Sequence, residues 1–239
     1  MTKILHLSDL HIQNKGAVIW DTNTKSNFVG AINCIKELND IDAIVISGDM
    51  SNDGSLWSYQ YVDKILAEVG IPTYCCPGNH DNLKLFYAGY KPKFYSTQEL
   101  QKINDWTFIL LNSAVEGMSR GMIDLENLKY LLSQATGNIA IVLHHPPIEQ
   151  EGWLNRKLLE NRDEFNDIVF ENHNVKLVLY GHTHYHTSQL FNNIIYSSAP
   201  SIGFAFNPTL PKFQIAKGEE GLTMITMDGG NIQIEKILI

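Results

Sequence analysis

Five short apolar runs in this sequence each end in polar side chains that carry oxygen or nitrogen donor atoms. The runs and the residues that close them are Lys3–Ser8 before Asp9-Leu10-His11, Ala43–Ser47 before Gly48-Asp49, Ile71–Cys76 before Pro77-Gly78-Asn79-His80-Asp81, Ile139–Leu143 before His144-His145, and Val175–Tyr180 before Gly181-His182-Thr183-His184. Within Ala43–Ser47, the run Ile44-Val45-Ile46 suits a strand covered on both faces. Because the carboxyl ends of strands in an open α/β sheet meet at one edge, where sites form, we expect these residues to converge there.

The remaining pattern predicts alternating strands and helices that give way to hairpins. Apolar residues at helical spacing predict helices over Lys25–Asn39, Ser55–Val69, Asp124–Gln134 and Arg156–Glu171, and a further strand is predicted over Trp106–Asn112. Turn sequences predict hairpins of Gln189–Phe191 with Ile194–Ser197 and of Leu222–Met227 with Ile232–Leu238. Loops are predicted over Asn14–Thr24 and Ser198–Gly221, and a loop with a short helix over Asn82–Glu99. No internal repeat or linker interrupts the chain, so we expect a single α/β domain over residues 1–239.

Charge and cysteine content argue against several classes of protein. The net charge of -8 disfavours a nonspecific basic face for nucleic acid or membranes. Three cysteines, with Cys75 and Cys76 adjacent on a predicted strand, do not indicate a disulfide framework and fit a reducing compartment. No apolar run approaches the ~18 to 20 residues of a membrane span. The first predicted strand leaves no room for a signal peptide, so we expect a cytoplasmic protein that does not bind membranes.

The donor atoms at the strand ends indicate a centre with two metal ions. The candidate ligands are Asp9, His11, Asp49, Asn79, a histidine from His144-His145, His182 and His184. They offer only oxygen and nitrogen, and they are too many for one zinc or iron ion. If Asp49 bridges two ions, each ion has four protein ligands and room for solvent or substrate. Imidazole and carboxylate suit Mn, Fe, Zn or Co, of which Mn or Fe is favoured.

Two ions ~3.5–4 Å apart form a clamp for in-line displacement at phosphorus, and they lower the pKa of bound water to about 7. A hydroxide bridging the ions is then the predicted nucleophile. His80 is not assigned to metal, and its imidazole suits protonation of the leaving alkoxide or stabilisation of its charge. His6 and His173 are interpreted as core or surface residues. His186 is left open between a structural role and a position behind the ligands.

Five ordered motifs resemble those of the calcineurin-like metallophosphoesterases. They are Asp9-x-His11, Gly48-Asp49-x-x-x-Asp53-Gly54, Gly78-Asn79-His80-Asp81, His144-His145-Pro146-Pro147 and Gly181-His182-x-His184. The resemblance implies a four-layer α-β-β-α sandwich, in which two mixed β-sheets pack face to face with helices outside. It also implies two ligand sets, which are Asp9, His11, Asp49 and His184 for one ion, and Asp49, Asn79, His144 and His182 for the other. By analogy His144 is favoured over His145, although the sequence leaves that choice open.

Within this family the chain is similar to the class III cyclic-nucleotide phosphodiesterases. The similarity lies in His144-His145-Pro146-Pro147 and in Ala199-Pro200-Ser201 with Phe204-x-Phe206-x-Pro208. We therefore expect the substrate to contact Asn79, His80, Phe204 and Phe206, with the phenylalanines stacking on a base. Protein phosphatases of the superfamily carry an aspartate and then an arginine where this chain has Asn52 and Asp53. The charge of Asp53 argues against a phosphoprotein substrate, and Asn52 cannot serve His80 as a carboxylate partner.

Three functions follow in order of preference. The first is a dimetal phosphodiesterase acting on a small phosphodiester, a 3′,5′-cyclic nucleotide. The second is the same chemistry on a glycerophosphodiester, a nucleotide pyrophosphate or a nucleic acid, the last disfavoured by the acidic charge. The third is a phosphoesterase-like scaffold that binds a partner without catalysis, which should show gaps among the ligands, and the sequence shows none. The oligomeric state and the natural substrate are not readable from the sequence.

Overall fold

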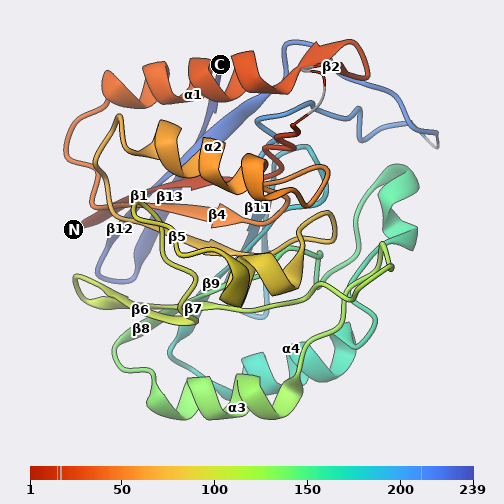
Figure 1. Cartoon of the computed structure of the whole chain (residues 1–239). Helices are drawn as coiled ribbons and strands as arrows, with labels where there is room; N and C mark the ends of the chain where they lie inside the picture. The colour runs from red at the N-terminus through yellow and green to blue at the C-terminus, as the bar shows by residue number, and fades with distance from the viewer. Residues whose placement is uncertain (15, 17, 211) are drawn as a thin grey trace.

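The computed structural model describes residues 1–14, 16, 18–210 and 212–239. Two β-sheets pack face to face, with α1 and α2 over one sheet and α3 and α4 over the other (Figure 1). In spatial order the first sheet contains β13 (Asn231–Leu238), β12 (Gly221–Asp228), β1 (Thr2–Leu7), β4 (Ala43–Ser47) and β5 (Thr73–Cys76). The second contains β10 (Thr187–Phe191), β11 (Ile194–Ser198), β9 (Val175–Tyr180), β8 (Asn138–Val142), β7 (Trp106–Leu110) and β6 (Leu100–Ile103). These are the four layers that the sequence predicts.

Both sheets are mixed, and their central strands run parallel. β1, β4 and β5 are parallel, while β12 returns antiparallel to β1 and pairs with β13. In the second sheet β7, β8, β9 and β11 are parallel, and β6 and β10 close the edges antiparallel. The parallel strands bring the carboxyl ends of β1, β4, β5, β8 and β9 toward one region, which is where the predicted site residues begin.

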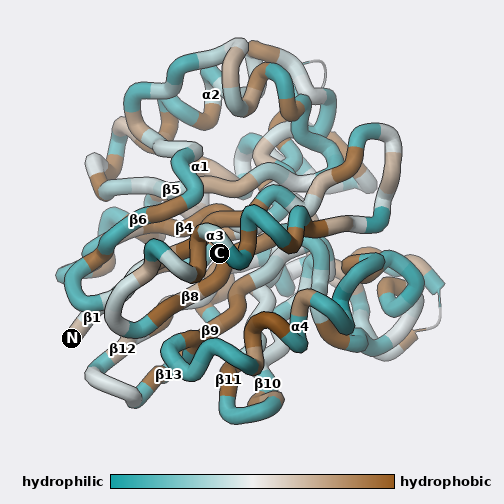
Figure 2. Tube along the Cα trace, turned by 90° about the horizontal axis from the view of Figure 1, so that it is seen from below, coloured by the Kyte–Doolittle hydropathy of each residue, from teal (hydrophilic) through white to brown (hydrophobic). Residues whose placement is uncertain are grey.

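Alternate side chains of each strand serve two apolar layers. Leu5 and Leu7 of β1 pack in the cluster beneath α1 and α2. Ile4 faces the other way and packs with Trp106 and Phe108 of the second sheet. Figure 2 shows this apolar character along β4, β8 and β9. Since successive strand residues point to opposite faces, both sheets are covered on both sides. The layer shared between the sheets supports the proposal that residues 1–239 form one domain.

The four helices are α1 (Thr24–Lys36), α2 (Leu56–Leu66), α3 (Leu125–Gln134) and α4 (Arg162–Glu171). The first three begin after a residue whose side chain accepts a backbone N–H of the first turn, namely Asn23, Ser55 and Asp124. The predicted helix start at Arg156 is wrong. A 3-10 helix covers Gly152–Arg156, and the Leu159 N–H then donates to the Pro146 carbonyl (3.0 Å), so α4 begins only at Arg162.

Other departures concern segments predicted as loops. Strand β6 was not predicted, because its residues gain their strand character from pairing with β7. The predicted loop Asn14–Thr24 contains the short pair β2 (Val18–Ile19) and β3 (Thr22–Asn23), while its positions 15 and 17 lie outside the described residues. Position 211 of the loop Ser198–Gly221 also lies outside them. A π-helical turn spans Leu85–Gly89. Within the described ranges, no helix has the length and apolar character needed to cross a bilayer.

Candidate metal centre

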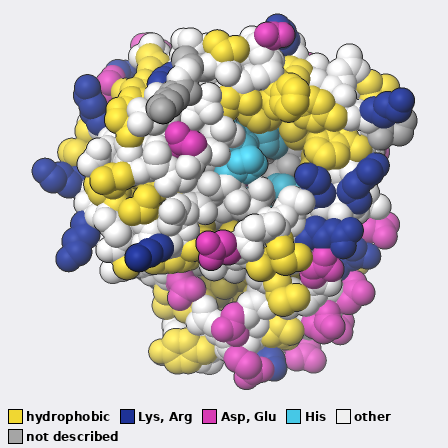
Figure 3. Space-filling view, turned by 45° about the vertical axis from the view of Figure 1, so that its right-hand side comes forward, with side chains coloured by type: hydrophobic (Ala, Val, Ile, Leu, Met, Phe, Trp, Pro, Cys, Tyr) yellow, Lys and Arg dark blue, Asp and Glu magenta, His cyan; other side chains and the backbone are white. Residues whose placement is uncertain are grey.

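The turns that follow the strands use unusual backbone conformations. Residues with positive φ include five predicted ligands, Asp9 (54°), His11 (47°), Asp49 (51°), His182 (67°) and His184 (57°). Residues other than glycine seldom adopt positive φ, and such strain concentrates at functional sites. Here the left-handed conformation turns each side chain back toward a common point beyond the strand ends. The histidines lie in a hollow of the molecular surface (Figure 3).

Glycine allows two of these turns to pass close to each other. Gly48 has a φ of 94°, and a Cβ there would lie 2.5 Å from Nδ1 of His144. A Cβ on Gly78 would meet the Asp49 carboxylate. The absence of side chains at both positions therefore lets the turns after β4 and β5 place Asp49 and Asn79 beside His144.

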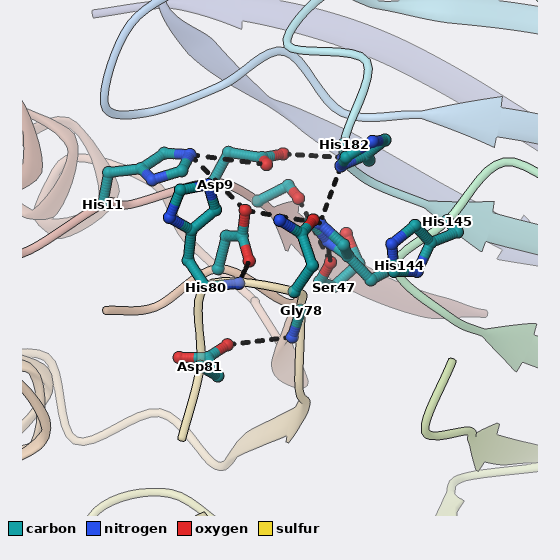
Figure 4. Close-up of polar contacts among 12 residues, drawn as sticks. Asp9, His11, Ser47, Gly78, His80, Asp81, His144, His145 and His182 are labelled. Atoms are coloured by element: carbon teal, nitrogen blue, oxygen red, sulfur yellow. Dashed lines mark hydrogen bonds and ion pairs between the residues drawn. The ribbon is translucent and has the colours of Figure 1, made fainter. Parts of the chain in front are cut away.

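One group of donor atoms comes from Asp9, His11 and His184, all buried. Nε2 of His184 lies 3.2 Å from Oδ1 of Asp9 and 3.2 Å from Nε2 of His11. A second group surrounds His144, whose Nε2 lies 3.2 Å from Oδ1 of Asn79 and 3.2 Å from Nδ1 of His182. Figure 4 shows the side chains of the labelled members pointing toward one another.

Asp49 lies between the two groups. Its Oδ2 is 3.6 Å from Nε2 of His11 and 3.4 Å from Nε2 of His144. Its Oδ1 accepts the backbone N–H of His80 at 2.8 Å, which orients the carboxylate. The structure therefore brings all seven predicted ligands into two groups that share one carboxylate.

The tautomers implied by the surrounding hydrogen bonds fit bound cations. Nδ1 of His184 donates to the Phe204 carbonyl (2.7 Å), and Nδ1 of His11 donates to Oδ1 of Asn52 (3.2 Å). In a neutral imidazole the other nitrogen then carries a lone pair. The Nε2 lone pairs of His11 and His184 thus face each other at 3.2 Å, which is repulsive unless a cation lies between them. Nδ1 of His144 likewise donates to the Ser47 carbonyl (2.8 Å).

The charges of the site also favour cations. Burial lowers the pKa of His144, but the carboxylates of Asp49 and Asp9 outweigh it and raise the pKa of His144 to about 9. Burial would raise the pKa of Asp49, yet the neighbouring His144 holds the pKa of that carboxyl well below its usual range. Burial lowers the pKa of His11 to about 3. The carboxylates therefore remain ionised and attract positive charge, while His11 offers a lone pair.

The adjacent residues His144 and His145 have different surroundings. His144 contacts Asp49, Asn79 and His182, as described above. Nδ1 of His145 instead lies 2.9 Å from Oγ of Ser113, which also accepts the backbone N–H groups of both histidines at 3.2 and 3.1 Å. This placement supports His144 as the ligand and leaves His145 beside the second group.

His80 lies at the exposed side of the centre. Its ring is 4.9 Å from that of His11, nearly perpendicular to it, and its Nδ1 lies 3.3 Å from the Asn52 carbonyl. The side chain of Asn52 is used by His11, so a backbone carbonyl takes the place of a carboxylate partner for His80. Asp53 accepts N–H and O–H groups from Asn14, Ser55 and Ser58, which fixes the start of α2.

Residues 2–186 match the sequence profile of the calcineurin-like phosphoesterases. This chain belongs to that family. It is therefore a metal-dependent hydrolase of phosphoric esters. The membership agrees with the geometry, because the matched segment ends just after the last predicted ligand.

Curated relatives of this phosphoesterase align over most of its length. The chain is 30% identical over 234 residues to a 3′,5′-cyclic-nucleotide phosphodiesterase of Nostoc sp., covering 90% of this chain and 86% of the relative. It is 27% identical over 243 residues to the 3′,5′-cyclic adenosine monophosphate phosphodiesterase CpdA of Haemophilus influenzae, covering 98% and 88%. In fold it resembles a dimetal phosphatase from Danio rerio, with a TM-score of 0.69 at 11% identity over 98% and 95% of the two chains.

Phe204 and Phe206 lie against two candidate ligands of the phosphoesterase. Both are buried, at 4% and 6% exposure. The Phe204 ring stacks on His11 at 4.8 Å, and the Phe206 ring stacks on His184 at 4.2 Å with an 11° angle between the planes. Each phenylalanine therefore packs against a candidate ligand, and both are largely shielded from solvent.

Three residues that hold the site in place were not predicted from the sequence. They are Ser113, Asp81, and Asn52 through its contact with His11. The buried Asp81 carboxylate accepts the N–H groups of Gly78 and Ser51 at 2.9 and 3.0 Å, and so ties together the turns after β4 and β5. Asp81 belongs to the motif Gly78-Asn79-His80-Asp81, so the sequence offered a signal from which its role could have been predicted. Nothing in the sequence distinguished Ser113. Of the remaining histidines, His6 is buried and His173 exposed, while His186 bonds to the Ser198 carbonyl (2.7 Å).

Proposed function

We propose that this phosphodiesterase hydrolyses a small phosphodiester, a 3′,5′-cyclic nucleotide, at a centre of two divalent metal ions. The observation that carries the proposal is the pair of donor groups sharing Asp49, with His80 at their exposed side. The names of the relatives in Nostoc and Haemophilus support a cyclic-nucleotide substrate.

Each half of the centre would hold one ion. Asp9, His11, Asp49 and His184 would bind the first, and Asp49, Asn79, His144 and His182 the second. Among Mn, Fe, Zn and Co, we favour Mn or Fe. When bound, the ions would activate a water molecule as nucleophile and offset the charge of the phosphate oxygens. The protein would hold the phosphate beside Asn79, near the exposed imidazole of His80.

His80 would act on the leaving group. Its imidazole is exposed, while its backbone N–H is anchored on Asp49. From this position it would give a proton to the alkoxide oxygen that leaves phosphorus, a contribution typically worth about 10²- to 10⁴-fold in rate. We expect His80→Ala to keep its metal content and lose rate, most strongly with poor leaving groups. Loss of metal from this variant would show that His80 is itself a ligand.

The direct test is hydrolysis of cyclic AMP and cyclic GMP by the purified protein with added manganese. Turnover of either nucleotide supports the proposal. If an aryl phosphodiester is cleaved and neither nucleotide is, the substrate class is wrong and the chemistry stands. Metal analysis of the same sample addresses the scaffold alternative, which predicts less than one equivalent and no further uptake.

A further inference from the structure

A group of aromatic side chains lies beside the candidate metal centre and belongs to no strand of the two main sheets. It comprises Trp20, Trp153, Phe206 and Phe213, which we call the aromatic platform. Its members come from three segments distant in sequence: the turn after β2, the 3-10 helix Gly152–Arg156 and the loop before β12. Figure 3 shows hydrophobic side chains gathered next to the histidines of the hollow.

Ring contacts connect the platform to a metal ligand. Phe206 stacks on His184 at 4.2 Å, and Phe213 meets Phe206 edge to face at 4.9 Å. Trp20 follows, 4.9 Å from Phe213, while Trp153 contacts both phenylalanines at 5.4 and 5.7 Å. Two ring contacts therefore separate His184 from Phe213.

The solvent-exposed fraction of the side chain rises from Phe206 through Phe213 to Trp20. Phe206 is 6% exposed, Phe213 38% and Trp20 60%. The inner ring thus supports the ligand, whereas the outer rings leave large apolar faces in water next to a site for phosphate esters. The ammonium group of Lys157 lies 5.3 Å from the Trp153 ring, which adds positive charge at the border of the platform.

We propose that Trp20 and Phe213 form the surface on which the nucleobase of the substrate stacks. This inference rests on the proposed function and moves base contact outward from Phe204 and Phe206. The ring contacts place Phe213 two rings and Trp20 three rings from His184, so these exposed faces border the region where the phosphate of the substrate would lie. Stacking on an aromatic face is worth roughly 1–3 kcal/mol per base and tolerates different bases. We therefore expect the platform to accept different bases and to discriminate little between adenine and guanine.

The test compares a nucleotide with its baseless counterpart. In Trp20→Ala and Phe213→Ala, kcat/KM for cyclic AMP should fall on the order of 10-fold, mainly through KM. Turnover of ribose 3′,5′-cyclic phosphate should change far less. The matched control is Tyr130→Ala, which removes an equally exposed ring (61%) on α3, away from the strand ends. Trp20→Phe keeps an aromatic face and should restore most of the loss.

Two results would contradict the proposal that the base stacks on Trp20 and Phe213. One is an unchanged kcat/KM for cyclic AMP in Trp20→Ala and Phe213→Ala, and the other is an equal loss on the baseless substrate. If the wild-type protein cleaves no cyclic nucleotide, the proposed function fails first, and tryptophan fluorescence then tests the platform separately. Quenching by AMP but not by ribose 5-phosphate, lost in Trp20→Phe, supports base stacking. Equal responses to both ligands contradict it.

Discussion

The two halves of the candidate metal centre are held by different kinds of structure. The half around His144 is fixed by the sheets, through the Ser47 carbonyl at the end of β4 and through Ser113 just beyond β7. The half around His11 and His184 depends on the loop after β11. There the Phe204 carbonyl accepts from His184, and the Phe204 ring stacks on His11.

The same loop also supports Asp9, whose carbonyl accepts from Oγ of Ser201 and from the N–H of Gly203, both at 2.9 Å. This difference teaches that one half of the candidate centre is positioned by contacts at the ends of β4 and β7, and the other by the hydrogen bonds and ring packing of the loop after β11. Since loops can change where strands cannot, we expect the loop-held half to set which substrates fit. The predictions below separate the two halves.

The largest effect is expected at the residue common to both halves. Asp49→Asn removes the charge that faces His11 and His144, so both ions should bind poorly. Activity should fall by more than about 100-fold, because even loss of an outer partner of a ligand costs 10- to 100-fold. Metal analysis and steady-state kinetics measure this, with Asp53→Asn as the control carboxylate outside both groups. Retention of two equivalents would remove Asp49 from its bridging role.

The loop-held half should respond to Phe204→Ala. The truncation should lower the free energy of unfolding by about 3–5 kcal/mol and weaken binding of one ion out of two, because His11 and His184 lose their packing. Phe165→Ala is the matched control, since Phe165 is also buried but belongs to α4, on the other sheet. Denaturant unfolding and metal titration of both variants test the comparison. Equal metal affinities would mean that Phe204 contributes only to stability.

The sheet-held half should respond to Ser113→Ala by a smaller amount. Oγ of Ser113 is the acceptor for the N–H groups of His144 and His145, so its removal leaves buried donors without a partner. We expect a loss of about 2 to 3 kcal/mol in the free energy of unfolding and weaker binding of the other ion. Ser197→Ala serves for comparison, because its buried hydroxyl bonds to the Thr187 carbonyl and not to a candidate ligand. If Ser113→Ala instead weakens binding of the ion at the His11 half, the two halves are not independent.

The smallest effect concerns pH and a histidine that belongs to neither half. Burial lowers the pKa of His6 from 6.5 to about 3. A histidine with a lowered pKa stabilises the fold fully above 6.5, and this stability is lost as pH falls toward 3, because only the unfolded chain takes up the proton. Between pH 6.5 and 5.5 the loss from this group is about 1 kcal/mol. Unfolding of metal-free protein should show a shallower pH slope in His6→Asn, and an unchanged slope would assign the titration to other groups.

Much of the fold was predictable because it is encoded locally. The strands Ala43–Ser47 and Val175–Tyr180 agree residue for residue with the apolar runs. Helices α3 and α4 end at the predicted residue, whereas α1 and α2 each end three residues earlier than predicted, since terminal turns lack partners for their N–H and C=O groups. Strand β6 and the start of α4 were not predictable in this way, because pairing with β7 and contact with Pro146 decide them.

For the site, the amino-acid sequence by itself determined the donor atoms and their order along the chain. Their residue types and their positions after apolar runs are properties of neighbouring residues. Only the tertiary structure decided that Ser113 contacts Nδ1 of His145, that Phe204 and Phe206 stack on candidate ligands, and that Trp20 reaches Phe213. These contacts join residues tens to nearly two hundred positions apart. Which of many possible distant partners a side chain meets depends on the packing of the whole chain, and no local pattern records it.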